Sequence, residues 1–272
     1  MKKVLLIGST GLIGKQLKST LSKHFFLICP TKKDKFDITK KKELSKYLNE
    51  SIDIVINLSG QRNNNQKKMI ETIYKGNLNI LDISKKIKKK ILLIYVSSSL
   101  VYGNSKIKKK EISKKKPINK YEKIKYEIEK KYLKINKNFL ILRLCNIYGS
   151  KSSKGIINLI LQAIKNKKIF EIDNIKTFKN FIHIHDVVNI IHFLIIKNIK
   201  NKILNVGNEN ICFKDLIKII NKITKNSFKF TNKNKNINLT LSQKIDTSLI
   251  KKIMSKYKFQ KIEKYLNNEI AN

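Results

Sequence analysis

The chain opens with a short apolar run that ends in a glycine-rich turn and leads directly into a helix pattern. Val4 to Ile7 are apolar, and Gly8, Gly11 and Gly14 follow with the spacing G-x-x-G-x-x-G. The run predicts a buried strand, and the apolar periodicity after it predicts a helix. Glycines let a backbone approach a ligand closely, and free N–H groups at a helix N-terminus face an anion. The turn therefore predicts a pyrophosphate site, the alternative being a strand-to-helix turn that binds nothing.

The net charge of +41 comes almost entirely from lysine, because Arg62 and Arg143 are the only arginines among 272 residues. Such a charge is typical of proteins that bind nucleic acid or anionic membranes. Arginine, however, is the residue favoured for bidentate contacts with nucleic acid, and the lysines are spread along the whole chain. We therefore expect no specific nucleic-acid partner, and only a weak, salt-sensitive affinity for polyanions.

Cysteine usage and hydropathy predict a cytoplasmic protein without a metal site. The three cysteines are odd in number and widely spaced, which indicates neither a disulfide framework nor a zinc site. His183 and His185 alternate in a strand-like rhythm and are predicted to be packed or exposed side chains, not metal ligands. The apolar run at 190–196 is far shorter than a membrane span, so no membrane partner is expected.

Apolar runs recur along the first half of the chain and alternate with helix patterns. The predicted strands cover Val4–Ile7, Phe25–Cys29, Ile52–Leu58, Ile91–Val96 and Phe139–Leu144. A helix is predicted from about Lys120 to Leu133, immediately before the last of these strands. Nearly continuous apolar strands that alternate with helices indicate a parallel sheet covered on both faces. The fold class is therefore an α/β, Rossmann-type, doubly wound parallel sheet, which binds ligands at the carboxyl ends of its strands.

The pattern changes after Ser150, which predicts a second, smaller lobe. Residues 1–150 are assigned to a dinucleotide-binding domain, with 181–200 packing back onto it. Residues 151–180 and 201–272 are assigned to an interleaved C-terminal α/β lobe that binds the substrate. Asp186 is predicted to be the N-cap of a helix.

Tyr121 and Lys125 are four residues apart in the predicted helix, so their side chains share one face. A tyrosine must lose about 3 pKa units, or about 4 kcal/mol, to act as a base near neutral pH. A neighbouring ammonium ion and a cationic nicotinamide ring both favour that change. The serine cluster Ser97 to Ser99 ends the preceding strand, and one hydroxyl there could bind the oxygen that Tyr121 protonates.

Eight motifs in order resemble one family, the extended short-chain dehydrogenase/reductases, or NAD(P)-dependent nucleotide-sugar epimerase/dehydratase group. The motifs are GSTGLIG at 8–14, FDI at 36–38, NLSG at 57–60, SSSLVYG at 97–103, YEKIK at 121–125, RLCNIYG at 143–149, FIHIHDVV at 181–188 and LNVGN at 204–208. The resemblance implies an enzyme that epimerises or reduces a nucleotide sugar, with coupled proton and hydride transfer at nicotinamide C4. It also implies a homodimer.

The resemblance assigns roles to individual residues. Tyr121 is the general acid/base, Lys125 its partner and a contact of the nicotinamide ribose, and Ser98 the hydroxyl that steadies the substrate oxygen. The implied cofactor-binding residues are Gly8, Gly11, Leu12, Ile13, Gly14, Thr31, Lys32, Asp37, Ile38, Leu58, Ser59, Gly60 and Lys125. The implied substrate-binding residues are Ser98, Asn146 and Lys179.

The chain departs from the family pattern in three places. Ile73 stands where the family usually has a helix-borne asparagine that relays protons. Ser98 is followed by Ser99 and Leu100, whereas 4,6-dehydratases have Thr-Asp-Glu there, so this chain is not expected to eliminate water by that route. No arginine occurs after Arg143 to bind a nucleotide diphosphate, a role left to lysines such as Lys179.

The segment after the second strand bears on the choice of cofactor. Thr31, Lys32 and Lys33 follow Cys29, and no acidic residue is predicted where a ribose 2′-hydroxyl would be bound. This pattern favours NADP over NAD. The alternative function is a non-catalytic NADP-binding sensor or scaffold of the same fold, which the replacement at Ile73 keeps open.

Overall fold

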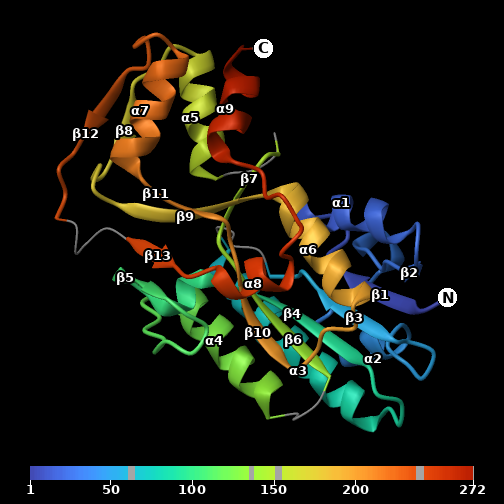
Figure 1. Ribbon diagram of the computed structural model, residues 1–272. Helices are drawn as coiled ribbons and strands as arrows, with labels where there is room; N and C mark the ends of the chain where they lie inside the picture. The colour runs from blue at the N-terminus through green and yellow to red at the C-terminus, as the bar shows by residue number, and fades with distance from the viewer. Residues whose placement is uncertain (61–64, 135–137, 151–154, 237–241, 272) are drawn as a thin grey trace. The chain divides into compact units, whose positions relative to one another are not determined.

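The computed structural model describes residues 1–60, 65–134, 138–150, 155–236 and 242–271 (Figure 1). The chain divides into two compact units. Unit 1 comprises Met1–Val101, Pro117–Arg143 and Val188–Leu204, and unit 2 comprises Tyr102–Lys116, Leu144–Val187 and Asn205–Asn272. Within the described ranges, no helix has the length and apolar character needed to cross a bilayer. The assignment of dinucleotide and substrate binding to separate domains stays a prediction.

Unit 1 is built on a six-stranded sheet with the order β10-β6-β4-β3-β1-β2. The strands are β1 (Lys3–Ile7), β2 (Phe26–Ile28), β3 (Ile54–Asn57), β4 (Leu92–Ser98), β6 (Phe139–Leu144) and β10 (Lys202–Val206). β1 pairs in parallel with both β2 and β3, and β3 pairs in parallel with β4. The register places Ile7 beside Asn57, so the carboxyl ends of β1 and β3 are neighbours.

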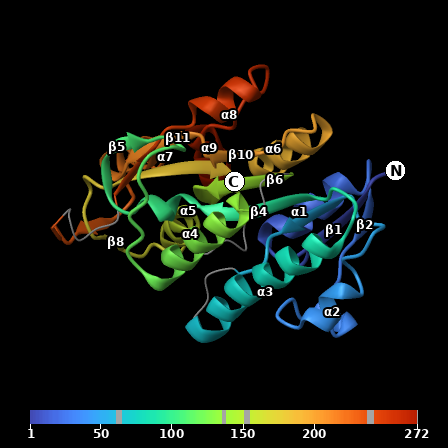
Figure 2. The ribbon, with the colours of Figure 1, turned by 90° about the horizontal axis from the view of Figure 1, so that it is seen from below.

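Helices cover both faces of this sheet, as Figures 1 and 2 show. One face carries α2 (Lys41–Ser45), α3 (Gln66–Lys86) and α4 (Lys120–Leu133), and the other carries α1 (Leu12–Leu21) and α6 (Ile184–Ile196). Alternate strand residues such as Leu93 and Tyr95 pack against Ile128 and Tyr132 of α4 in a single apolar core. This arrangement confirms the predicted Rossmann-type doubly wound sheet.

In its described residues, unit 2 has its own apolar core and three small sheets. The first sheet has the order β11-β9-β7, with β7 (Asn146–Tyr148), β9 (Phe178–His183) and β11 (Glu209–Cys212). The other two are the parallel pairs β8 (Phe170–Ile172) with β12 (Phe230–Asn232), and β5 (Ser105–Lys109) with β13 (Gln243–Ile245). The helices are α5 (Ile156–Lys165), α7 (Phe213–Ile223), α8 (Ser248–Ile253) and α9 (Ile262–Ala271). Phe181, Leu216 and Ile262 are among the residues that meet in the core.

One predicted helix start is wrong. α6 begins at Ile184, so Asp186 lies inside its first turn and not at the N-cap. The carboxylate of Asp186 instead accepts hydrogen bonds from the Tyr257 hydroxyl at 2.7 Å and from the Gln260 backbone N–H at 3.0 Å. Asp186 therefore ties α6 to the C-terminal segment, a long-range role that local pattern does not reveal.

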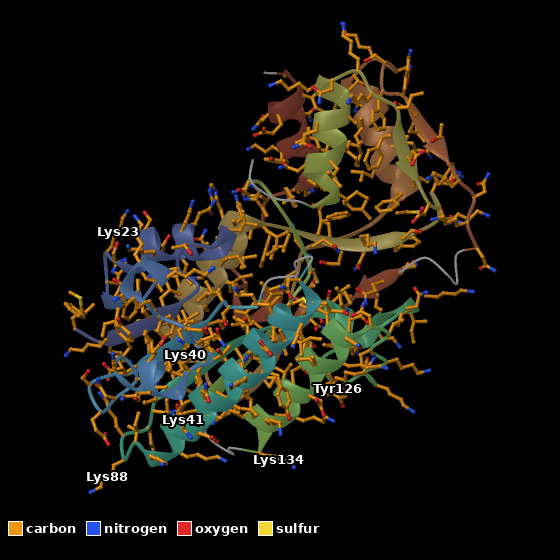
Figure 3. All side chains as sticks on the ribbon, turned by 180° about the vertical axis from the view of Figure 1, so that it is seen from behind. Lys23, Lys40, Lys41, Lys88, Tyr126 and Lys134 are labelled. Atoms are coloured by element: carbon orange, nitrogen blue, oxygen red, sulfur yellow. The ribbon has the colours of Figure 1, made fainter. Side chains whose placement is uncertain are left out.

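Lysines project from many elements of unit 1, as Figure 3 shows. Lys23 follows α1, Lys40 and Lys41 lie at the start of α2, Lys88 follows α3 and Lys134 follows α4. This spread agrees with the even distribution of lysine along the sequence.

Candidate active site

Hydrogen bonds around the first turn of α4 fix the residue at which this helix begins. The Asn119 side chain caps the helix by accepting from the Glu122 backbone N–H at 3.0 Å. The Glu122 carboxylate reaches back and accepts from the Ile118 N–H at 2.6 Å and from the Asn119 side-chain amide at 2.7 Å. Such reciprocal capping satisfies N–H groups that a helix start leaves open. It also holds Tyr121 and Lys125 in the first two turns.

Lys125 is a buried cation that links α4 to β4. Only 4 % of the residue is exposed, and its Nζ donates to the Val96 carbonyl at 2.9 Å. The same Nζ lies 5.1 Å from the centroid of the Tyr95 ring and 5.7 Å from that of Tyr121. Burial lowers the pKa of Lys125 from its ordinary 10.5 to about 8, and the nearby Glu129 carboxylate opposes this shift. The predicted pair Tyr121 and Lys125 is therefore together, on the side of α4 that meets β4.

The pKa of Lys125 predicts a pH dependence of folding stability. Because the pKa is about 8 in the folded protein and about 10.4 in an unfolded chain, the unfolded state binds more protons between these values. The free energy of unfolding should therefore rise with pH across this window, by up to about 3 kcal/mol relative to Lys125→Met, which has no titrating group. Urea denaturation of both proteins between about pH 7 and about pH 10.5 measures the difference. A difference that stays constant with pH would contradict the buried state of Lys125.

Ser98 is the last residue of β4 and is buried. Its Oγ accepts from the Leu100 backbone N–H at 3.2 Å, at the start of the short 3₁₀ turn η2 (Ser99–Tyr102). Its neighbour Ser97 donates instead to the Glu129 carboxylate of α4 at 2.6 Å. Ser98 thus lies two residues beyond the carbonyl that Lys125 contacts. The catalytic roles of Ser98, Tyr121 and Lys125 stay predictions.

The glycine-rich turn joins β1 to α1 and is tightly packed. Gly8 has φ +84°, a left-handed conformation that favours glycine. A Cβ at Gly14 would lie 2.2 Å from the Gly8 carbonyl oxygen, so a side chain there has no room. Gly11 caps α1 without any side-chain hydrogen bond, and the first turn, which begins with Leu12 and Ile13, holds no acidic residue. These features suit an anion, because the helix-start N–H groups and the helix dipole attract negative charge.

Residues after β3 lie beside this turn. A Cβ at Gly8 would meet the Leu58 carbonyl carbon at 3.1 Å and the Ser59 nitrogen at 3.2 Å. The Ser59 N–H and hydroxyl both donate to the Asn57 side chain, at 2.9 and 2.6 Å. Gly60 has φ +87°, and a Cβ there would lie 2.2 Å from Ile73 Cγ1. The predicted cofactor residues at 8–14 and 58–60 are therefore adjacent.

The loop after β2 contains an acidic residue, Asp34, which the prediction of the cofactor from this segment did not consider. Thr31 caps the 3₁₀ turn η1 (Lys32–Asp34), and the Asp34 carboxylate accepts from the Thr31 N–H at 2.8 Å and from its hydroxyl at 2.9 Å. The T-x-x-D spacing is a capping-box signal that the sequence already carried. Because both bonds hold Asp34 against Thr31, its carboxylate is occupied by the turn itself, while Lys32 and Lys33 are exposed.

Asp37 and Ile38 lie further along the same segment. Asp37 Oδ1 accepts from the N–H and the hydroxyl of Thr39 at 2.9 and 2.8 Å. Ile38 is buried, and its side chain lies against Gly76 of α3, where a Cβ would meet Ile38 Cγ2 at 2.9 Å. The segment is thus anchored to α3. Its predicted contact with an adenine ring stays a prediction.

The two predicted substrate residues that follow residue 144 are in unit 2. Asn146 is on β7, and its side-chain amide donates to the Asn180 carbonyl at 2.9 Å. Lys179 is on β9, the strand that pairs in parallel with β7. Both side chains therefore come from one small sheet of unit 2.

Comparisons with known proteins place the chain in a family. The family model described as NAD dependent epimerase/dehydratase matches residues 4–207. The chain belongs to the NAD dependent epimerase/dehydratase family. It is 32 % identical over 177 residues to ADP-L-glycero-D-manno-heptose-6-epimerase of Brachyspira hyodysenteriae, a match covering 59 % of this chain and 55 % of that protein. The chain thus spans little more than half the length of that relative.

Two further proteins are similar to this chain, one compared by sequence and one by structure. The chain is 26 % identical over 220 residues to GDP-6-deoxy-D-talose 4-dehydrogenase of Aggregatibacter actinomycetemcomitans, covering 75 % of this chain and 74 % of that one. The structure of RMD from Pseudomonas aeruginosa, solved with NADPH, superposes with a TM-score of 0.82. At 18 % identity, covering 100 % of this chain and 98 % of that one, it shows a shared fold. The resemblance that the eight motifs indicate is confirmed.

Sequence reasoning missed two buried polar networks in this member of the epimerase/dehydratase family. In the first network, Arg143 forms an ion pair with Glu129, with Nη2 2.7 Å from Oε2. Asn77 accepts from the Asn57 side chain at 2.9 Å and from the Tyr132 hydroxyl at 3.0 Å, beneath the end of β3. The i, i+4, i+8 spacing of Tyr121, Lys125 and Glu129 was the available signal for the first network.

Proposed function

We propose that the protein is an NAD(P)-dependent enzyme that epimerises or reduces a nucleotide sugar, with Tyr121 as the proton acid/base. The observation that carries this is the buried ammonium group of Lys125, 5.7 Å from the centre of the Tyr121 ring. A cation beside a phenol favours the ionised form of that phenol. Membership of the epimerase/dehydratase family supports the same reading.

Tyr121, Lys125 and Ser98 have different proposed roles at the sugar. Tyr121 takes a proton from a sugar hydroxyl, or returns one to the matching ketone oxygen. Lys125 stabilises the phenolate form of Tyr121, which is present before a proton is taken and after one is returned. Ser98 holds the sugar oxygen by a hydrogen bond. Burial of Lys125 removes competing water, which strengthens its electrostatic effect on Tyr121.

The glycine-rich turn fits a dinucleotide. The backbone of residues 8–14 would hold the pyrophosphate, residues 58–60 would line its neighbourhood, and Asp37 with Ile38 would meet the adenine ring. Close packing of Gly14 on Gly8, and an α1 start without acidic side chains, are what such a site requires. The bound nicotinamide would accept or donate the hydride at its C4 atom.

We favour NADP over NAD, because Asp34 is engaged by Thr31 and the neighbouring Lys32 is exposed. Lys32→Ala should raise the Kd for NADPH about tenfold, as expected from one lost charge-assisted phosphate contact, and leave the Kd for NADH nearly unchanged. Lys23→Ala, an exposed lysine after α1 (Figure 3), is the matched control. Fluorescence titration of both dinucleotides measures the values. Equal changes for NADPH and NADH would count against a 2′-phosphate site at Lys32.

A nucleotide sugar is the proposed substrate, because both relatives are named for nucleotide sugars, one ADP-linked and one GDP-linked. Asn146 and Lys179 are the proposed contacts with its phosphates. The test begins with mass spectrometry of the purified protein for a retained dinucleotide and continues with a panel of ADP-, UDP-, GDP- and dTDP-sugars. Inversion without net change at 340 nm indicates an epimerase, and stoichiometric NADPH consumption indicates a reductase. No turnover of any sugar would favour the alternative below.

One observation favours a second candidate, a non-catalytic NADP-binding sensor or scaffold. Ile73, where the resemblance implies that the family has a relay asparagine, is fully buried and packs against Gly60. A sensor would bind the dinucleotide and show no turnover. The homodimer and the cytoplasmic location also stay predictions, and sedimentation equilibrium would test the first of them.

A further inference from the structure

A buried ion pair lies next to the proposed site and has no assigned role. Arg143 of β6 binds Glu129 of α4 through two nitrogens, with Nη2 2.7 Å from Oε2 and Nε 3.0 Å from Oε1. The Ser97 hydroxyl of β4 donates to the same Oε1 at 2.6 Å. The exposed fractions of Glu129 and Arg143 are 0 % and 1 %. A buried pair of this kind gains little net stability over apolar residues, so its presence invites another explanation.

The ion pair contributes to the contact between α4 and the carboxyl end of β4. Lys125 donates to the Val96 carbonyl, and one residue later Ser97 donates to Glu129, one helical turn beyond Lys125. These two bonds join the helix that carries Tyr121 to the strand that ends in Ser98. A shift of one element against the other would break both bonds and misplace the proposed reacting groups.

We propose that Glu129, held by Arg143 and Ser97, is a positioning residue that fixes Lys125 and the end of β4 and keeps a cation at Lys125. The proposal rests on the proposed function for the role of Lys125. Glu129 supplies an anion one helical turn beyond Lys125, on the same face of α4.

Other groups near Lys125 do not supply this negative charge. Tyr95 of β4 and Tyr121 of α4 present their rings to its ammonium group, and Tyr132 stacks on Tyr95 with centroids 5.0 Å apart. Burial raises the pKa of Tyr95 well above 10, so its phenol is neutral at ordinary pH. Arg143 is a cation and faces Glu129. Glu129 is therefore the carboxylate that acts on Lys125 among these residues.

The test replaces the whole pair, because removing one partner would leave an uncompensated buried charge and endanger folding. Glu129→Met with Arg143→Met keeps apolar volume and removes both charges. Glu127→Met, at an exposed position on the same helix, is the matched control. Two properties are measured for the double variant and for the control. The first is the pH window in which the free energy of unfolding rises, compared with the same protein that also carries Lys125→Met. The second is the pH profile of kcat, together with the KM for the dinucleotide.

The stability window of the double variant should start about one pH unit lower than in the wild type, because Lys125 loses its anion. We also expect kcat to fall about tenfold, with less than about a threefold change in the KM for the dinucleotide. The pH at which kcat declines on the basic side of its profile should move down by about one unit as well. An unchanged stability window, or one matching that of Glu127→Met, would overturn the proposal. A shifted window in a protein whose Tyr121→Phe variant is fully active would support the role of Glu129 at Lys125 and overturn the proposed function instead.

Discussion

Tyr121→Phe is expected to lower kcat by about 10²- to 10⁴-fold, the range that a positioned general acid/base contributes. The substitution removes one hydroxyl and keeps the ring that packs against the core beside Lys125. The Kd for the dinucleotide should therefore change less than about threefold, and the free energy of unfolding by less than about 0.5 kcal/mol. Steady-state kinetics with the sugar identified by the panel, together with urea denaturation, measures all three quantities.

Tyr126→Phe is the matched control for this experiment. Tyr126 is on the same helix as Tyr121, is labelled in Figure 3 and lies under the Lys130 side chain, with Nζ 5.3 Å from its ring centroid. The chemical change is identical, so kcat should stay within about twofold of the wild type. Equal kcat values for the two variants would remove Tyr121 from the mechanism.

Gly14→Ala is expected to have the largest effect on the dinucleotide site. The added Cβ would lie 2.2 Å from the Gly8 carbonyl oxygen and 2.7 Å from Ser9 Cα, both rigid backbone atoms. The turn must move, which we expect to cost about 1 to 3 kcal/mol or more of folding stability and to abolish detectable dinucleotide binding. Urea denaturation and fluorescence titration measure the two effects.

Gly11→Ala separates folding from binding at the same turn. Its Cβ would lie 3.3 Å from the Gly8 carbonyl oxygen, a tight contact that small movements can relieve. We expect a stability loss below about 1 kcal/mol, because φ at Gly11 is −75° and alanine adopts it readily. Binding should still weaken if a pyrophosphate approaches the backbone here. Wild-type dinucleotide affinity in both variants would contradict the location of the site.

Local pattern was sufficient to predict the core of unit 1. The bounds of β6 and α4 coincide with the predicted ranges, since an apolar run and a capped amphipathic helix are both short-range signals. Some strand ends differ from the predicted ones. The predicted strand Phe25–Cys29 is longer than β2 (Phe26–Ile28), and the predicted strand Ile52–Leu58 is longer than β3 (Ile54–Asn57). Hydrogen bonds to the neighbouring strands set those ends, and the sequence of a single strand does not show which of its residues form them.

Contacts between distant residues could not be predicted. Ser97, Glu129 and Arg143 join three elements, β4, α4 and β6. In the sequence, each of these residues taken alone is compatible with an exposed or a structural side chain. β5 pairs with β13 although more than a hundred residues separate Ser105 from its partner Gln243. No local feature of either short segment indicates that the two segments pair with each other. Asp34 is different, because its T-x-x-D capping box is a local signal that the sequence carries.

The proposed function requires the Tyr121 phenol, beside the buried Lys125 cation, to transfer the proton during hydride transfer. The most direct measurement is the single-turnover rate at 340 nm across pH, for wild type and Tyr121→Phe loaded with the same dinucleotide and sugar. We expect the wild-type rate to fall as pH rises through about 8, where Lys125 loses its proton, and Tyr121→Phe to be slower by at least about 100-fold. Equal rates in the two proteins, with no change near pH 8, would contradict it.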